Sequence, residues 1–204
     1  LSLLDHKLEI NGIRQIAVSD SQKVAMFPYG RKIEMNEGFD FKFDGVIQAG
    51  RFTYWGHDFL FNYDQFRISM TDIDSMKFKV QSFTPDVMGR RPLRYVRTTL
   101  QDFNGELYID KPNNKSSRRV YHDYPIFTSG KKNYIYYDRR DIYDRVYPRE
   151  TFFVEVHQFT IDSLDNATAE GLSFDGTFVS AGIFPEMEQT LRVQRDYSLG
   201  FRIA

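Results

Sequence analysis

The sequence predicts an all-β fold, in which antiparallel sheets form a sandwich or a repetitive stack with at most one or two short helices. Three observations support this prediction: apolar and polar residues alternate, aromatic residues make up 16% of the chain, and Asn-Gly or Asp-Gly recurs. Phe and Tyr supply most of the aromatic content, and both favour pleated, half-buried surfaces. Because 204 residues suit one β domain, we expect residues 1–204 to form a single domain or a fragment of a longer repetitive β protein.

The alternation identifies the strands in chain order. Over residues 39–43, every second position is Phe, and the period of two continues over 59–63 and 66–70. It returns over 152–156 and 159–161. This period is typical of strands with one buried face and one wetter face. Helical spacing is scarce, and only residues 141–147 predict a helix, of one or two turns.

Recurring glycine dipeptides predict where the chain reverses. An apolar residue followed by Asn-Gly or Asp-Gly occurs at 10–12, 43–45, 103–105 and 174–176. These dipeptides readily adopt the positive φ angles of tight turns, so we expect hairpins there. Two copies extend into similar phrases, FDGVIQAGRF at 43–52 and FDGTFVSAGIF at 174–184. Together with the shared IDS tripeptides that begin at Ile73 and Ile161, they favour a repeated unit over chance reuse of turns.

The middle of the chain has a different character. Between residues 84 and 129 the alternation weakens, and four prolines interrupt it. An internal boundary near 84–92 and an elaborated loop between two strands are both consistent with this stretch.

Composition excludes several function classes. A formal net charge of −1 gives no overall field toward nucleic acid, and the chain has no RNP-like or helix-turn-helix pattern. The absence of cysteine excludes disulfides, Cys-ligated zinc and a thiol nucleophile. No apolar run approaches the roughly 20 residues of a membrane helix, so we expect no transmembrane segment in this chain. Because the chain begins at Leu1 and stops within a strand-like pattern, we expect it to be a fragment.

Two aromatic segments are candidate ligand-binding sites. Tyr54 and Trp55 precede His57, and such a group could stack on a sugar ring and hydrogen-bond its hydroxyls. The alternative is that one ring packs in the core and the other caps a turn at Gly56. Tyr134 and Tyr136 begin a second segment that is rich in Tyr, Asp and Arg, which suits either a polar aromatic surface or an exposed strand face.

A basic stretch and the scattered acidic and histidine residues complete the candidates. Arginine and lysine gather between residues 89 and 119, which favours a solvated face or a surface that docks a partner. The four histidines have no metal-binding spacing, and no nucleophile elbow or phosphate-binding glycine loop is present. We therefore assign no catalytic residue, no metal ligand and no cofactor.

The phrases FDGVIQAGRF, FNYDQFRISMTDIDSM and GLSFDGTFVSAGIFPEM resemble segments of large, repetitive, uncharacterised envelope proteins of Bacteroidota. The resemblance implies a periplasmic or extracellular address and a much longer parent chain, and it implies no activity. The first hypothesis is thus a non-enzymatic structural or interaction module that contacts a protein partner or the rest of a longer chain. The alternatives are a glycan- or lipid-binding β domain and a glycan-active hydrolase.

Overall fold

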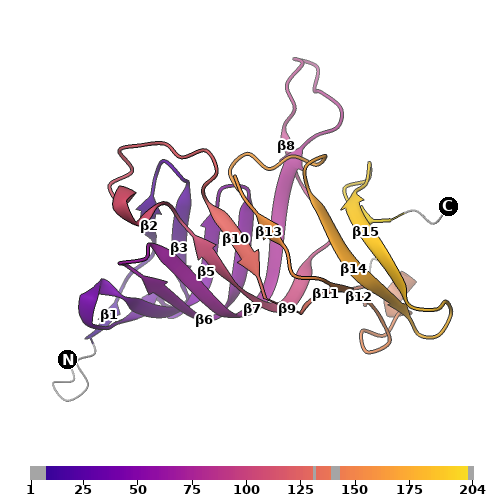
Figure 1. Cartoon of the computed structure of the whole chain (residues 1–204), viewed down its shortest axis with the longest axis horizontal. Helices are drawn as coiled ribbons and strands as arrows, with labels where there is room; N and C mark the ends of the chain where they lie inside the picture. Colours follow the sequence, from indigo (N-terminus) through magenta and orange to yellow (C-terminus); the bar gives the residue numbers. More distant parts are fainter. Residues whose placement is uncertain (1–7, 131, 139–142, 202–204) are drawn as a thin grey trace.

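The computed structural model describes residues 8–130, 132–138 and 143–201, and strands dominate these ranges (Figure 1). The all-β prediction is confirmed. The helical elements in the described ranges are four 3₁₀ turns of three residues each: η1 (Tyr29–Arg31), η2 (Glu37–Phe39), η3 (Pro112–Asn114) and η4 (Tyr143–Arg145). Of the helix predicted over 141–147, residues 141 and 142 lie outside the described ranges, and η4 is a single 3₁₀ turn.

Sixteen strands within the described ranges make up one antiparallel sheet. The first seven are β1 (Leu8–Asn11), β2 (Ile16–Ser19), β3 (Val24–Pro28), β4 (Lys32–Met35), β5 (Phe41–Ala49), β6 (Phe52–Asn62) and β7 (Arg67–Gln81). The others are β8 (Leu93–Tyr95), β9 (Leu100–Tyr108), β10 (Ile126–Ser129), β11 (Asn133–Tyr136), β12 (Phe152–Val156), β13 (Thr160–Ile161), β14 (Ser173–Ser180), β15 (Met187–Val193) and β16 (Leu199–Gly200). The main order is β1-β4-β5-β6-β7-β9-β11-β12-β14-β15-β16.

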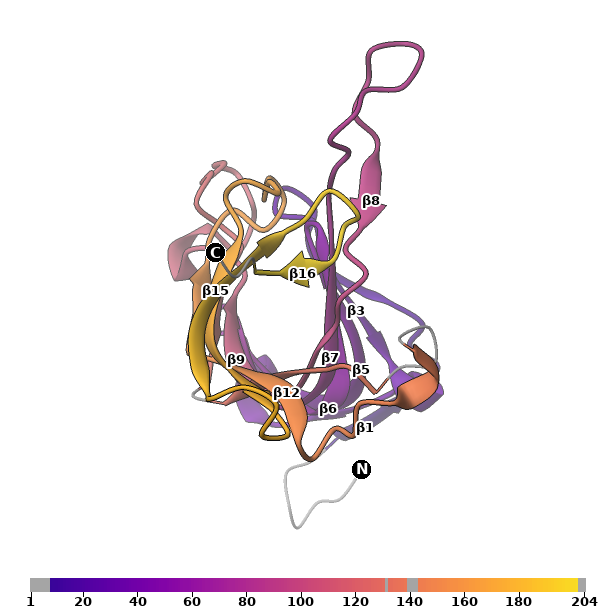
Figure 2. The ribbon, with the colours of Figure 1, turned by 90° about the vertical axis from the view of Figure 1, so that its right-hand side faces the viewer.

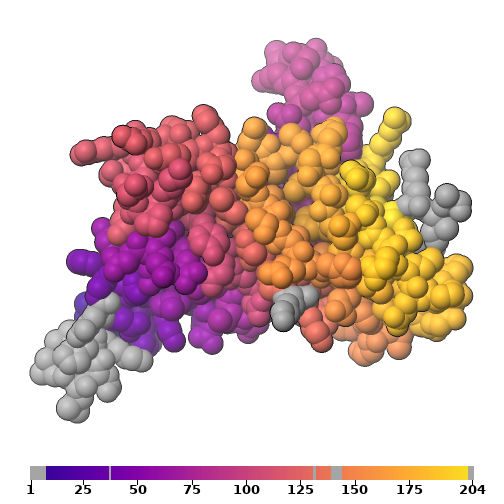
Figure 3. Space-filling view, viewed as in Figure 1, coloured from indigo at the N-terminus to yellow at the C-terminus, as the bar shows by residue number. Residues whose placement is uncertain are grey.

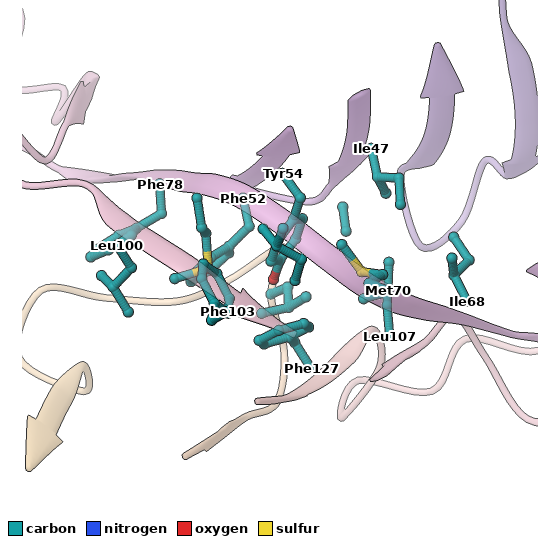
Figure 4. Close-up of a cluster of buried hydrophobic side chains, with 14 of the residues drawn as sticks. Ile47, Phe52, Tyr54, Ile68, Met70, Phe78, Leu100, Phe103, Leu107 and Phe127 are labelled. Carbon is teal, nitrogen blue, oxygen red and sulfur yellow. The ribbon is translucent and has the colours of Figure 1, made fainter. Parts of the chain in front are cut away.

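The sheet curves round so that its inner face packs on itself, as the view along the long axis shows (Figure 2). Phe78 of β7 contacts Phe174 of β14 with ring centroids 6.1 Å apart, although three strands separate β7 from β14 in the sheet order. Near the C-terminal end, the backbone N–H of Arg97 donates to the carbonyl of Tyr197. The enclosed face is a continuous core of Phe, Ile, Met, Leu and Val side chains, part of which is drawn in Figure 4.

The alternation predicted from the sequence matches the burial of the strands. Phe41, Phe43, Phe59 and Phe61 are all buried, whereas Lys42 between the first two is exposed and Leu60 between the last two is half-buried. The first residue of the run is an exception, because Phe39 lies in η2 and is 67% exposed.

The hairpin prediction for Asp-Gly and Asn-Gly is wrong at all four positions. Gly12 follows β1, but β1 pairs with β4 and β2 pairs with β3, so within the described residues no hairpin joins β1 to β2. Gly45, Gly105 and Gly176 lie inside β5, β9 and β14, where a Cβ would collide with a neighbouring backbone or with Phe127. The reversals fall instead on the Ala-Gly part of the two similar phrases. Gly50 (φ +58°) joins β5 to β6, and Gly182 (φ +80°) follows β14. Each phrase is therefore one strand followed by its turn.

Residues 84–92, where the sequence allows a boundary, form the outer part of the β7–β8 hairpin. Beyond the hairpin the chain enters β9, which pairs with β7 from Arg67↔Tyr108 to Met76↔Leu100. The sheet thus continues across this point.

Candidate functional site

Tyr54 belongs to the core and lies apart from the other candidate residues. Its side chain is fully buried, and its ring centroid is 4.8 Å from that of Phe127 (Figure 4). Within the described residues its hydroxyl has no hydrogen-bond partner, and burial raises its pKa well above the usual value. Tyr54 therefore cannot contact a ligand on the surface.

Trp55 and His57 lie on the outer face of the sheet. Trp55 is half-buried and pairs with Val46 of β5, and Lys77 Nζ lies 6.0 Å from its ring centroid. His57 is exposed: its Nδ1 lies 3.6 Å from a carboxylate oxygen of Asp44, and its Nε2 lies 3.6 Å from one of Asp74. The alternative predicted from the sequence is correct in placing one ring in the core, since Tyr54 faces inward, but it is wrong about a turn at Gly56, which lies within β6.

Tyr134 and Tyr136 form an aromatic cluster with Phe153 on the same outer side. The two tyrosine rings are stacked with centroids 5.7 Å apart, and Phe153 meets the ring of Tyr134 edge-on at 5.8 Å. Desolvation, followed by the charge of Asp102 and a hydrogen bond with it, raises the pKa of Tyr136 to about 12. Tyr136 is thus held neutral well above pH 7.

Arg149 ties this cluster to the neighbouring strand. Its guanidinium carbon lies 4.2 Å from the ring centroid of Tyr136, and its Nε donates to Asp138 at 2.9 Å. Its Nη2 donates to Gln101 Oε1 at 3.2 Å, while Nη1 lies 3.7 Å from Asp102 Oδ2. This arginine therefore lies between two carboxylates and links β11 to β9.

The strand register places the two groups of candidates on one line. Trp55 pairs with Ser75, Ser75 pairs with Gln101, and Gln101 pairs with Tyr134. The line continues to Glu155 of β12. Directly paired residues share a face, so these side chains form one row across the outer surface. Adjacent strands lie about 4.8 Å apart, so Trp55 and Tyr134 are separated by roughly 14 Å.

The sequence reasoning did not identify the second candidate surface, the tip of the β7–β8 hairpin. This hairpin projects from the body of the molecule in all three views (Figures 1–3). At its tip Val87 is 106% exposed and Met88 is 73% exposed. On β8 of the hairpin, Leu93 and Tyr95 are also about half exposed, at 47% and 53%. The hairpin therefore presents apolar side chains that nothing in the described structure covers.

Hydrogen bonds hold the tip in one shape. Asp86 Oδ1 accepts from the backbone N–H of Met88 at 2.9 Å and of Arg90 at 2.8 Å, and Asp86 Oδ2 accepts from Arg90 Nε. The bond from the backbone N–H of Arg90 is the main cause that lowers the pKa of Asp86. Between the tip and the paired strands, Arg91 Nη1 donates to the carbonyls of Ser82 and Phe83.

The base of the hairpin borders a hollow of about 540 Å³. Arg94, Arg97, Tyr95 and Tyr197 contribute to its wall, and the backbone N–H of Phe83 donates to the hydroxyl of Tyr197 at 3.1 Å. The hollow thus combines guanidinium groups with aromatic rings. The rest of the basic stretch lies elsewhere, on the connection between β9 and β10, where Lys111 and Lys115 cover tyrosine rings.

No family model matches the chain, and no curated protein and no solved structure is significantly similar to it. Within the described residues, no helix is long and apolar enough to span a membrane.

Proposed function

We propose that this chain is a non-enzymatic interaction module that docks on a protein partner through the β7–β8 hairpin. The observation that carries the proposal is the tip, where Val87 and Met88 stand in solvent on a turn fixed by Asp86. Exposed apolar groups that project together favour association, and a turn that is already ordered loses little entropy when it binds.

The chemistry of the hairpin specifies its partner. Val87 and Met88 would enter a shallow apolar pocket, and the flexible thioether of Met88 suits an irregular wall. Arg94 is exposed on the same hairpin, whereas Arg90 is already paired with Asp86. Guanidinium groups pair best with carboxylates, so we expect acidic side chains around the partner's pocket. The hollow beside Arg94 and Tyr95 would receive one of them.

The resemblance to repetitive envelope proteins supports a periplasmic or extracellular location for this module. In this proposal the chain is a piece of a larger periplasmic or extracellular protein, and the hairpin connects it to a neighbouring protein of the same compartment. The balanced charge of the chain as a whole agrees with recognition through a local patch rather than through a long-range field.

A comparison of variants in extracts of the native cells tests the proposal. The double variant Val87→Ser/Met88→Ser removes the apolar tip, and Val120→Ser, at a site 61% exposed on the β9–β10 connection, is the matched control. Each variant is immobilised and exposed to the extract. We expect the wild type and the control to bind the same protein, and the double variant not to bind it. Equal retention of that protein by all three would refute docking through the hairpin.

A further inference from the structure

The row of paired residues from Trp55 to Tyr134 on the outer surface is more polar in its middle than regular alternation of buried and exposed residues would make it. On β7, Ile73 and Met76 are both buried, so the two residues between them, Asp74 and Ser75, both lie on the outer side. The register between β6 and β7 shifts at this point, which is the mark of a β-bulge.

The facing strand repeats this arrangement. On β9, Leu100 and Phe103 are both buried, and the residues between them, Gln101 and Asp102, face outward. Asp102 has a φ of +55°, which breaks the alternation. Two irregular segments on paired strands therefore bring four polar side chains to the surface between Trp55 and Tyr134. We call these six residues the outer band: Trp55, Asp74, Ser75, Gln101, Asp102 and Tyr134.

We propose that the outer band binds an uncharged oligosaccharide laid across the strands. Sugar rings offer an apolar C–H face to an aromatic ring and hydroxyls that both donate and accept hydrogen bonds. The band supplies an aromatic ring at each end, and between them it supplies one hydroxyl, one amide and two carboxylates. Tyr and Trp give large, rigid contact areas whose ordering loses little entropy.

Charge and geometry argue for this ligand over the other classes. The band carries two carboxylates, Asp102 near Arg149 and Asp74 near His57, and His57 is charged only when protonated, so the band disfavours an anionic ligand. An extended peptide binds a sheet by adding at an edge strand, whereas β7 and β9 are paired on both sides here. A lipid chain would remove water from the four central polar groups and offer them no hydrogen bond in return.

The separation of the two rings specifies the length of the ligand. Because Trp55 and Tyr134 are roughly 14 Å apart, one sugar residue cannot contact both. Affinity should therefore rise steeply with chain length, and a monosaccharide should bind weakly at best.

Intrinsic fluorescence and calorimetry test the proposal, since Trp55 is the sole tryptophan. The probes are cellohexaose, xylohexaose, maltohexaose and chitohexaose, each compared with its monosaccharide. We expect one hexaose to shift the emission of Trp55 saturably. In calorimetry, Trp55→Ala and Tyr134→Ala should each weaken its binding at least tenfold, and Ser75→Arg, which fills the centre of the band, should do the same.

Tyr95→Ala, which removes an exposed tyrosine of the hairpin, is the matched control and should bind the hexaose as the wild type does. Thermal unfolding of each variant verifies that its fold is intact. Binding of none of the four hexaoses would overturn the proposal. So would binding that survives both Tyr134→Ala and Ser75→Arg, or a fluorescence response to phospholipid vesicles alone. None of these results depends on the hairpin, so the two proposals can fail separately.

Discussion

At the scale of single residues, what each side chain does depends on the face of the sheet that it occupies. Tyr54 and Trp55 are neighbours in the chain, but Tyr54 is buried against Phe127 and Trp55 faces outward. Sequence reasoning could name the pair as aromatic and half-buried. It could not assign the two faces, because a shift of one residue in strand register exchanges them.

The buried hydroxyl of Tyr54 gives the first prediction. A buried polar group without a partner destabilises the folded state by about 1–3 kcal/mol, and Tyr54→Phe removes the hydroxyl while it keeps the ring. We expect the free energy of unfolding to rise by about 1 kcal/mol, as measured by urea denaturation. A fall of similar size would mean that the hydroxyl is hydrogen-bonded in solution.

Tyr137 gives a prediction on pH. Burial raises its pKa to about 12, whereas a tyrosine in the unfolded chain titrates near 10. The folded state therefore retains the proton that the unfolded state releases, so stability is fully present below pH 10 and falls as pH rises toward 12. We expect Tyr137→Phe to reduce this loss, by up to about 1.4 kcal/mol per pH unit, in urea denaturation between pH 9 and 11. Identical pH dependence in both proteins would show that the hydroxyl of Tyr137 is not desolvated in the folded state.

At the scale of elements, glycines decide how closely the strands approach. The Asp-Gly dipeptides predict turns because they favour positive φ angles. Gly45 and Gly176 lie inside strands instead, because the neighbouring backbone leaves no room for a side chain. Which of these two properties a strand uses depends on the neighbouring strand, and the local sequence does not contain that information. The same holds for the bulges that turn Asp74 and Asp102 outward.

A substitution at Gly56 tests whether the neighbouring strand lies too close for a side chain. A Cβ at this position would collide with the carbonyl oxygen of Asp72 on the neighbouring strand, and overpacking of this kind destabilises by about 1–3 kcal/mol. We expect Gly56→Ala to lower the free energy of unfolding by at least about 2 kcal/mol. Gly200→Ala, where a Cβ would meet only the side chain of Gln194 at 3.3 Å, is the control and should lower it by about 1 kcal/mol or less. Equal effects would show that strand separation at Gly56 is not tight.

The hairpin should be dispensable for folding. Residues 84–91 bury no apolar side chain, and β7 is held by β6 and β9 without them. We expect a variant in which an Asn-Gly turn replaces these residues to unfold within about 0.5 kcal/mol of the wild type. A larger loss of stability, measured by urea denaturation, would mean that the hairpin serves the fold rather than a partner.

At the scale of the whole molecule, one curved sheet encloses one core. Alternation, chiefly of Phe residues, was sufficient to predict the all-β class and the strands β5, β6, β7, β12 and β13. Strand order, curvature and the projection of the hairpin could not be predicted, because they arise from pairings between distant segments. Residues 84–92 have the composition of any loop, and only the fold reveals that Val87 and Met88 are left uncovered.

The continuity of the core predicts cooperative unfolding. Trp55 on β6 reports on the first half of the sheet, and circular dichroism reports on all strands. Because the core joins both halves, the two signals should give the same thermal midpoint. Two separated transitions would instead indicate independent domains that meet near residues 84–92.

Site-specific photocrosslinking in the native cells is the most direct test of docking through the β7–β8 hairpin. A photoreactive residue replaces Met88 in one variant and Val120 in the control, and both positions are exposed. Docking through the hairpin predicts one discrete protein adduct from position 88 and none of the same mass from position 120. The same adducts from both positions, no adduct from position 88, or adducts with lipid alone would contradict it.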